Sequence, residues 1–194
     1  MIKVELFTLE NMKMIFWFIE RCRGVDQLPK WHPEGDVFKH SIQVGSLAFR
    51  ESSDVDLILA AYLHDVGKIV LSREHPRIGC ILLRPYVSSK TLFLIKHHMR
   101  IWAFLNGEME KLSKCRFLAS HPYISELIQL ARWDHKGRNP NKKSIYNKYK
   151  IIDRLNKCAE QHFNVPDYLK GHEGCYGLND DKVESQEDIG RRII

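Results

Sequence analysis

Apolar residues recur at intervals of three and four along most of the chain, which is the spacing of amphipathic helices. Alternation with a period of two, typical of a half-buried strand, does not persist over any useful length. Asp54 and Ser120 are expected N-caps, Pro122 lies in an expected first turn, and Gly67 follows a helix end. We therefore expect a single all-α bundle with helices at about 10–22, 37–51, 54–65, 75–87, 89–104, 120–134 and 143–163.

Four polar residues interrupt the apolar faces of three of these helices. His40 lies on the apolar face of one helix, and Asp134 continues that of another. His64 and Asp65 close the apolar stretch "AAYLHDVGK" on the third. A buried carboxylate is costly unless it is paired or binds a metal. One such residue would be an ordinary hydrogen-bonded core group, but four on three helices indicate a shared polar site.

Imidazoles and carboxylates without thiolates suit a divalent metal such as Mn, Fe, Co, Ni or Zn, or a site that takes Mg. Because a His and an Asp that are adjacent at a helix end can diverge, Asp65 is placed to bridge to a second ion. His75, which opens a helix in "EHPRIG", is a further candidate ligand. His97 and His98 in "LIKHHMRIW" cannot fully share one helix face, so one of them is expected to be structural.

The five cysteines form no CxxC pair, which argues against a thiolate zinc site and favours a reducing compartment. The N-terminal segment lacks the small-residue cleavage site of a signal peptide. The longest apolar runs are far shorter than the roughly 20 residues that cross a bilayer. We therefore expect a cytoplasmic protein without a membrane partner, and the sequence indicates no oligomeric state.

Positive charge gathers in one part of the chain, whose formal net charge is +6. Between Lys136 and Lys157, eight basic residues face one acidic residue, Asp153. A basic face beside a site indicates a phosphate-bearing ligand or nucleic acid, while a solvated helix surface has the same composition. The charge alone leaves both interpretations open.

The order His40, then His64 and Asp65 in "HDVGK", then Asp134 resembles the HD-domain superfamily of metal-dependent phosphohydrolases. Within residues 31–139, five segments are similar to the HD domain of bacterial CCA-adding tRNA nucleotidyltransferases: "HPEGDVFKHS", "LHDVGK", "EHPRIG", "LIKHHMRIW" and "LARWDHKGR". Because only a short segment stands before this region, we expect no nucleotidyltransferase head. We therefore expect a stand-alone HD domain over 1–163 and a polar C-terminal tail over 164–194.

The resemblance implies that one metal is held by His40, His64, Asp65 and Asp134. In the two-metal branch of the superfamily, Asp65 would bridge to a second ion. His75 and His98, with His97 as the alternative to His98, would complete that second site, and Asp36 is a candidate supplementary ligand.

The resemblance also implies catalytic roles for Asp65 and Lys68, with Lys68 contacting a substrate phosphate. Arg100 and Arg138, each just past a ligand, are candidates for gripping a second phosphate or a nucleic-acid backbone. The expected function is hydrolysis of a phosphomonoester or phosphodiester by metal-activated water. The expected substrate is a phosphorylated small molecule, a nucleotide or an RNA end, including a 2′,3′-cyclic phosphate.

Two alternatives use the same fold. One is a diiron oxygenase with a His-rich two-metal site, and the other is a non-catalytic nucleotide- or RNA-binding HD module. Alarmone hydrolases also share the fold, but they carry an acidic pair where this chain has "VGKIV". A complete ligand set favours an enzyme.

Overall fold

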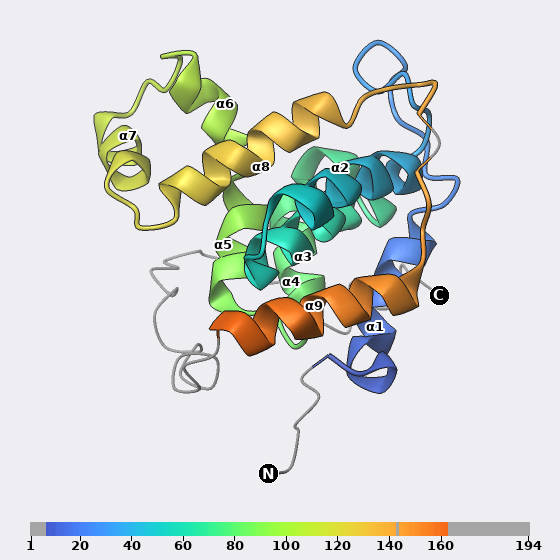
Figure 1. The fold of residues 1–194 in the computed structure, drawn as a ribbon. Coiled ribbons are helices and arrows are strands. Elements are labelled where there is room, and N and C mark those ends of the chain that lie inside the picture. The colour runs from blue at the N-terminus through green and yellow to red at the C-terminus, as the bar shows by residue number, and fades with distance from the viewer. Residues whose placement is uncertain (1–6, 143, 163–194) are drawn as a thin grey trace.

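The computed structural model describes residues 7–142 and 144–162, and within these ranges the regular structure is entirely helical (Figure 1). The α-helices are α1 Leu9–Arg21, α2 Val37–Glu51, α3 Val55–Leu63, α4 His75–Leu83, α5 Ser89–His97, α6 Arg100–Leu105, α7 Leu112–Ala119, α8 Ile124–Lys136 and α9 Lys148–His162. Two short 3₁₀ turns, η1 Val66–Ile69 and η2 Ser72–Glu74, connect α3 to α4. The predicted all-α fold is confirmed.

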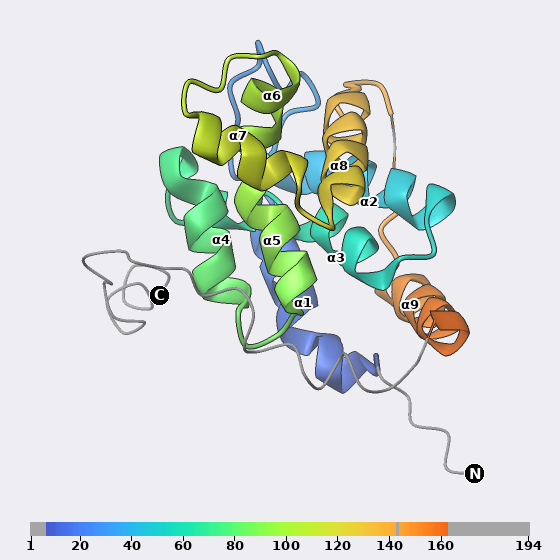
Figure 2. The ribbon, with the colours of Figure 1, turned by 90° about the vertical axis from the view of Figure 1, so that its left-hand side faces the viewer.

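Helix α3 forms the centre of the bundle and is covered by α2, α5, α8 and α9 (Figures 1 and 2). Every residue from Leu57 to Leu63 is buried, as expected of a helix that is apolar on all sides. Helices α6 and α7 lie at one end of the molecule and α1 and α9 at the other (Figure 2). His64 and Asp65, which directly follow α3, therefore lie in the interior.

Side-chain caps start helices α2, α3 and α5. Asp54 accepts a hydrogen bond from the backbone N–H of Leu57 at the start of α3, which confirms the cap predicted there. Asp36 caps α2 and Ser88 caps α5 in the same way. These caps fix where α2, α3 and α5 begin, and each of these helices carries or borders residues of the predicted site.

The predicted helix at 89–104 is two helices, α5 and α6, separated at His98 and Met99. The Nδ1 atom of His98 lies 2.7 Å from the carbonyl oxygen of Ile95, a local side-chain bond that competes with the helical ladder. The predicted helix at 75–87 ends earlier, at Leu83, because Pro85 has no N–H with which to continue the ladder.

Two further predictions were wrong in the region before α8. Helix α7 was not predicted, because only Leu118 of its eight residues is buried and the apolar spacing is weak. Ser120 is the C-cap of α7 and not the N-cap of the next helix. Helix α8 begins at Ile124, after Tyr123, so Pro122 lies in the preceding turn.

Residues 1–6, 143 and 163–194 lie outside the described ranges, and with them Lys143 of the basic stretch and the predicted tail. Within the described residues, no helix is both long and apolar enough to cross a membrane.

Candidate metal centre

The side chains of His40, His64 and Asp134 meet in the interior, although they come from α2, the end of α3 and α8. His40 Nε2 lies 3.0 Å from Asp134 Oδ1 and 3.2 Å from His64 Nε2. Asp65 Oδ2 closes this group, at 3.9 Å from His40 Nε2 and 3.6 Å from His64 Nε2. All four side chains are buried. We call these four residues the first group.

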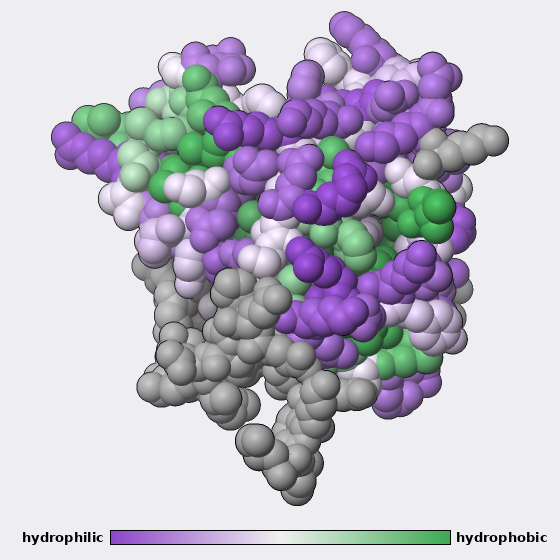
Figure 3. Space-filling model, in the orientation of Figure 1, coloured by the Kyte–Doolittle hydropathy of each residue, from purple (hydrophilic) through white to green (hydrophobic). Residues whose placement is uncertain are grey.

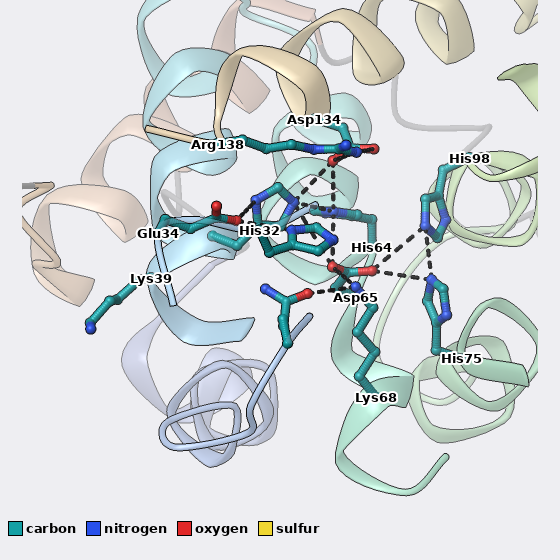
Figure 4. Close-up of polar contacts among 12 residues, drawn as sticks. His32, Glu34, Lys39, His64, Asp65, Lys68, His75, His98, Asp134 and Arg138 are labelled. Carbon is teal, nitrogen blue, oxygen red and sulfur yellow. Dashed lines mark hydrogen bonds and ion pairs between the residues drawn. The ribbon is translucent and has the colours of Figure 1, made fainter. Parts of the chain in front are cut away.

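Asp65 also faces a second group formed by His75 and His98. The Asp65 Oδ1 atom lies 3.1 Å from His75 Nε2 and 3.7 Å from His98 Nε2. Figure 4 shows Asp65 between the two groups, with His75 and His98 on one side and His64 and Asp134 on the other. The backbone of Asp65 adopts φ −102° and ψ 1°, a sparsely populated conformation that is common at active sites. Each oxygen of one carboxylate therefore serves one group.

Backbone carbonyls orient three of the four imidazoles in the same way. The Nδ1 atom of His64 faces the carbonyl oxygen of Ala61 at 3.1 Å. The Nδ1 atoms of His75 and His98 face the carbonyl oxygens of Ser72 and Ile95, each at 2.7 Å. Because a carbonyl only accepts, each Nδ1 carries the proton and each Nε2 presents a lone pair.

Glu34, which no sequence pattern indicated, orients the fourth imidazole. Its Oε1 atom lies 2.7 Å from His40 Nδ1 and 3.0 Å from His32 Nδ1. Burial acts to raise the pKa of Glu34, but His32 and His40 outweigh burial and lower this pKa to about 2. Glu34 is thus a buried, ionised carboxylate behind His40, the arrangement that commonly fixes a metal-binding histidine.

The second group fits a cation. The Nε2 atoms of His75 and His98 lie 3.1 Å apart, and Asp65 Oδ1 is a third acceptor beside them. Three acceptors that converge without a proton between them repel one another, so the arrangement calls for a proton or a metal ion. Neutral imidazole and carboxylate are the ligands of divalent transition metals.

The first group fits a cation for the same reason. Burial lowers the pKa of His64 to about 3, so this ring is neutral and free to coordinate. Burial acts to lower the pKa of His40 as well, but contacts with Asp134 and Glu34 outweigh burial and raise that pKa to about 9. Without a metal, the His40 ring therefore carries a proton on both nitrogens and faces the carboxylates of Asp134 and Glu34. A bound metal ion would replace the proton on Nε2.

Two cationic side chains border the first group. Lys68 Nζ donates to Asp65 Oδ2 at 2.6 Å and to Gln27 Oε1 at 2.7 Å. Burial acts to raise the pKa of Asp65, but the ammonium group of Lys68 holds that pKa well below its usual value. The Arg138 Nη2 atom lies 3.2 Å and 3.3 Å from the two oxygens of Asp134. Both cations thus face carboxylates that belong to the site.

Two candidate ligands, Asp36 and His97, lie elsewhere. Both carboxylate oxygens of Asp36 are engaged by backbone N–H groups, those of Lys39 and Gly24, so Asp36 is the cap of α2 and not a supplementary ligand. The His97 ring packs against Phe93 and Phe117, away from the groups around Asp65, so it is not the alternative to His98.

Arg100 and most of the basic stretch make no described contact with the site. Arg100 is exposed at the start of α6. Lys148 and Lys157 pair with Glu20 and Asp153, while Arg154 donates to the carbonyl oxygen of Ser52. Figure 3 shows that hydrophilic residues cover α8 and α9 on this face. Of the basic residues in this stretch, Arg138 is the one with a described contact to a member of the first group.

The HD domain family matches residues 37–155, which is more than half of the chain. The chain therefore belongs to the HD-domain family, and the resemblance to this superfamily of metal-dependent phosphohydrolases is confirmed. The match lies inside the predicted domain 1–163, and the boundary at 163 stays a prediction.

Two curated relatives are each named "Multifunctional CCA protein". The protein from Thioalkalivibrio sulfidiphilus is 44% identical over 57 residues, which is 29% of this chain and 14% of the relative. The protein from Methylococcus capsulatus is 37% identical over 75 residues, which is 35% of this chain and 18% of the relative. This chain therefore matches less than a fifth of the length of each of these relatives.

Proposed function

We propose that this protein is a metal-dependent phosphohydrolase that uses two divalent ions. The observation that carries this proposal is the placement of Asp65, whose two oxygens face two separate groups of metal-binding atoms. His40, His64, Asp65 and Asp134 would hold one ion, and Asp65, His75 and His98 the other. Such ions lower the pKa of bound water towards neutrality and stabilise negative charge on a phosphoryl group.

The cations beside the ligands favour an anionic substrate. Lys68 is partly exposed, and its ammonium group, 2.6 Å from Asp65 Oδ2, is close enough to reach a phosphoryl oxygen beside the metals. Arg138 offers a guanidinium group beside Asp134 that suits a second phosphate. Two cations beside the ligands suit the charge of a phosphate, and on this ground we favour phosphate chemistry over the oxygenase alternative. The complete ligand set in turn favours an enzyme over a non-catalytic module.

The proposed substrate is a nucleotide or an RNA end, including a 2′,3′-cyclic phosphate. Support comes from the similarity to two proteins named for CCA and from the basic segment that follows Asp134. The other candidate is a small phosphomonoester, which would contact Lys68 without reaching Arg138.

The test is hydrolysis by the metal-reconstituted protein. Chelated protein should regain activity on a phosphomonoester, p-nitrophenyl phosphate, or on phosphodiesters, bis-p-nitrophenyl phosphate and nucleoside 2′,3′-cyclic phosphates, when Mn, Fe, Co, Ni, Zn or Mg is supplied. Asp65→Asn should abolish this activity, whereas Asp153→Asn, a change in an exposed pair on α9, should not alter it. Absence of hydrolysis with every metal and both substrate types, in protein shown to carry metal, would disprove the proposal.

A further inference from the structure

A closed loop, residues 26–36, lies between α1 and α2, and we call it the rim loop. Asp26 and Asp36 form an isolated antiparallel bridge at its base, and Val37 N–H donates to the carbonyl oxygen of Val25 at 3.0 Å. At its tip, the carbonyl oxygen of Leu28 accepts hydrogen bonds from the N–H groups of Trp31 and His32, each at 3.0 Å. The rim loop is therefore held at base and tip by backbone hydrogen bonds.

Both arms of the rim loop reach the metal centre. On one arm, Gln27 Oε1 accepts a hydrogen bond from Lys68. On the other arm, the His32 ring centroid lies 4.8 Å from that of His40, and Glu34 contacts His40 Nδ1. The residues between these arms are consequently held at the edge of the first group.

The tip between the arms exposes large apolar side chains. Leu28 is 71% exposed and Trp31 is 56% exposed, so neither contributes much to the core. The Lys30 Nζ atom lies over the Trp31 ring, 5.0 Å from its centroid, which places a positive charge on one face of the exposed indole. An exposed tryptophan adds little to stability, but one held rigidly next to a catalytic centre is suited to binding a ligand.

We propose that Trp31 is a stacking platform for the base of a nucleotide whose phosphate lies at the metal centre. This inference rests on the proposed function and names the part of the substrate that the metals do not recognise. One ribose separates a base from its phosphate, so the group that binds the base must lie beside the metals and not among them. Trp31 meets this requirement, because it directly precedes His32 at the wall of the first group.

The ligand chemistry follows from the side chains at the tip. A base stacks on an indole face without a fixed hydrogen-bond pattern, so Trp31 would accept several bases. Lys30 adds a charge that attracts the phosphate backbone of an RNA end. The prolines at 29 and 33 restrict the backbone on both sides, which reduces the entropy lost on binding.

The test compares AMP with ribose 5-phosphate, which carry the same phosphate ester and differ by the base. Both are titrated by calorimetry into the manganese-loaded protein. Stacking of one base is worth roughly 5- to 150-fold in affinity, so AMP should bind the wild type about tenfold more tightly than ribose 5-phosphate. Trp31→Ala should remove this preference, and Trp31→Phe, which keeps a ring, should retain most of it.

Trp17→Ala is the matched control, because Trp17 is partly exposed on α1 and its ring contacts Phe18 and Arg21. This variant should keep the full preference for AMP. Equal affinities of the wild type for the two ligands, or a preference that survives in Trp31→Ala, would overturn the inference. Failure of the proposed function can be told apart from failure of this inference. The first would appear as absence of hydrolysis, whereas these affinities do not depend on turnover.

Discussion

The contact between η1 and α4 determines whether His75 can reach Asp65, and Gly67 permits that contact. A Cβ atom on Gly67 would lie 2.1 Å from the carbonyl oxygen of His75 and 2.7 Å from the backbone nitrogen of Gly79. Both neighbours are backbone atoms that cannot rotate away. In Gly67→Ala, η1 and α4 must therefore separate by roughly 1 Å, because real Cβ atoms essentially never approach other atoms closer than 3.0 Å.

The cost of this separation falls on both stability and metal binding. Overpacking a core typically costs about 1–3 kcal/mol, and a clash with fixed backbone belongs at the upper end. For a chain of this size 3 kcal/mol lowers the melting temperature by roughly 6–12 °C. The 3.1 Å contact between His75 Nε2 and Asp65 Oδ1 would lengthen beyond the tolerance of metal ligands, about 0.2 Å. Gly67→Ala should therefore lose the second ion and keep the first.

The assay combines thermal unfolding by circular dichroism with a manganese titration. Gly79→Ala is the control, because the nearest atom to its added Cβ would be Ile95 Cγ2 at an ordinary 3.4 Å. A Gly to Ala change inside a helix is stabilising by up to about 1 kcal/mol, so this control should melt no lower than the wild type. The reasoning fails if Gly67→Ala melts with the wild type and still binds two ions.

Three further predictions concern single side chains. Glu34→Gln removes the charge behind His40 and should weaken metal affinity by about 10- to 100-fold in a chelator competition, and an unchanged affinity would refute the orienting role. Lys68→Met should lower kcat by about 100-fold without loss of bound metal, and metal loss equal to the loss of activity would show that Lys68 only supports Asp65. Burial raises the pKa of Asp56 above its value in the unfolded chain. The folded protein therefore loses stability as the pH rises through this folded-state pKa, because the ionised carboxylate stays buried. Asp56→Asn should therefore gain stability relative to the wild type in urea unfolding as the pH rises above the ordinary carboxyl pKa of about 4, and a difference that does not change with pH would contradict the assignment.

The sequence predicts the first group well because helical periodicity reports which side faces the core. The expected helix at 37–51 has the bounds of α2, and His40 and Asp134 lie on the buried faces that their spacing indicates. Polar residues that continue an apolar face on separate helices can meet only in the interior, and here they do.

Residues outside regular helices were harder to predict. Glu34 lies in a loop, where no periodicity shows that its side chain is buried. Asp36 stands directly before an apolar helix, which is an N-cap signal that could have identified its structural role. Between His97 and His98, the break after α5 and the ring contacts of His97 determine the orientation, and both depend on tertiary packing.

The most direct test of the central claim is the metal content of the purified protein, measured by elemental analysis after incubation with excess divalent ions. The placement of Asp65 between the two groups predicts two ions per chain in the wild type. Asp65→Ala should lose both ions while circular dichroism shows that the helices remain. Full metal occupancy in Asp65→Ala, or never more than one ion per wild-type chain with any of the supplied metals, would contradict a centre bridged by Asp65.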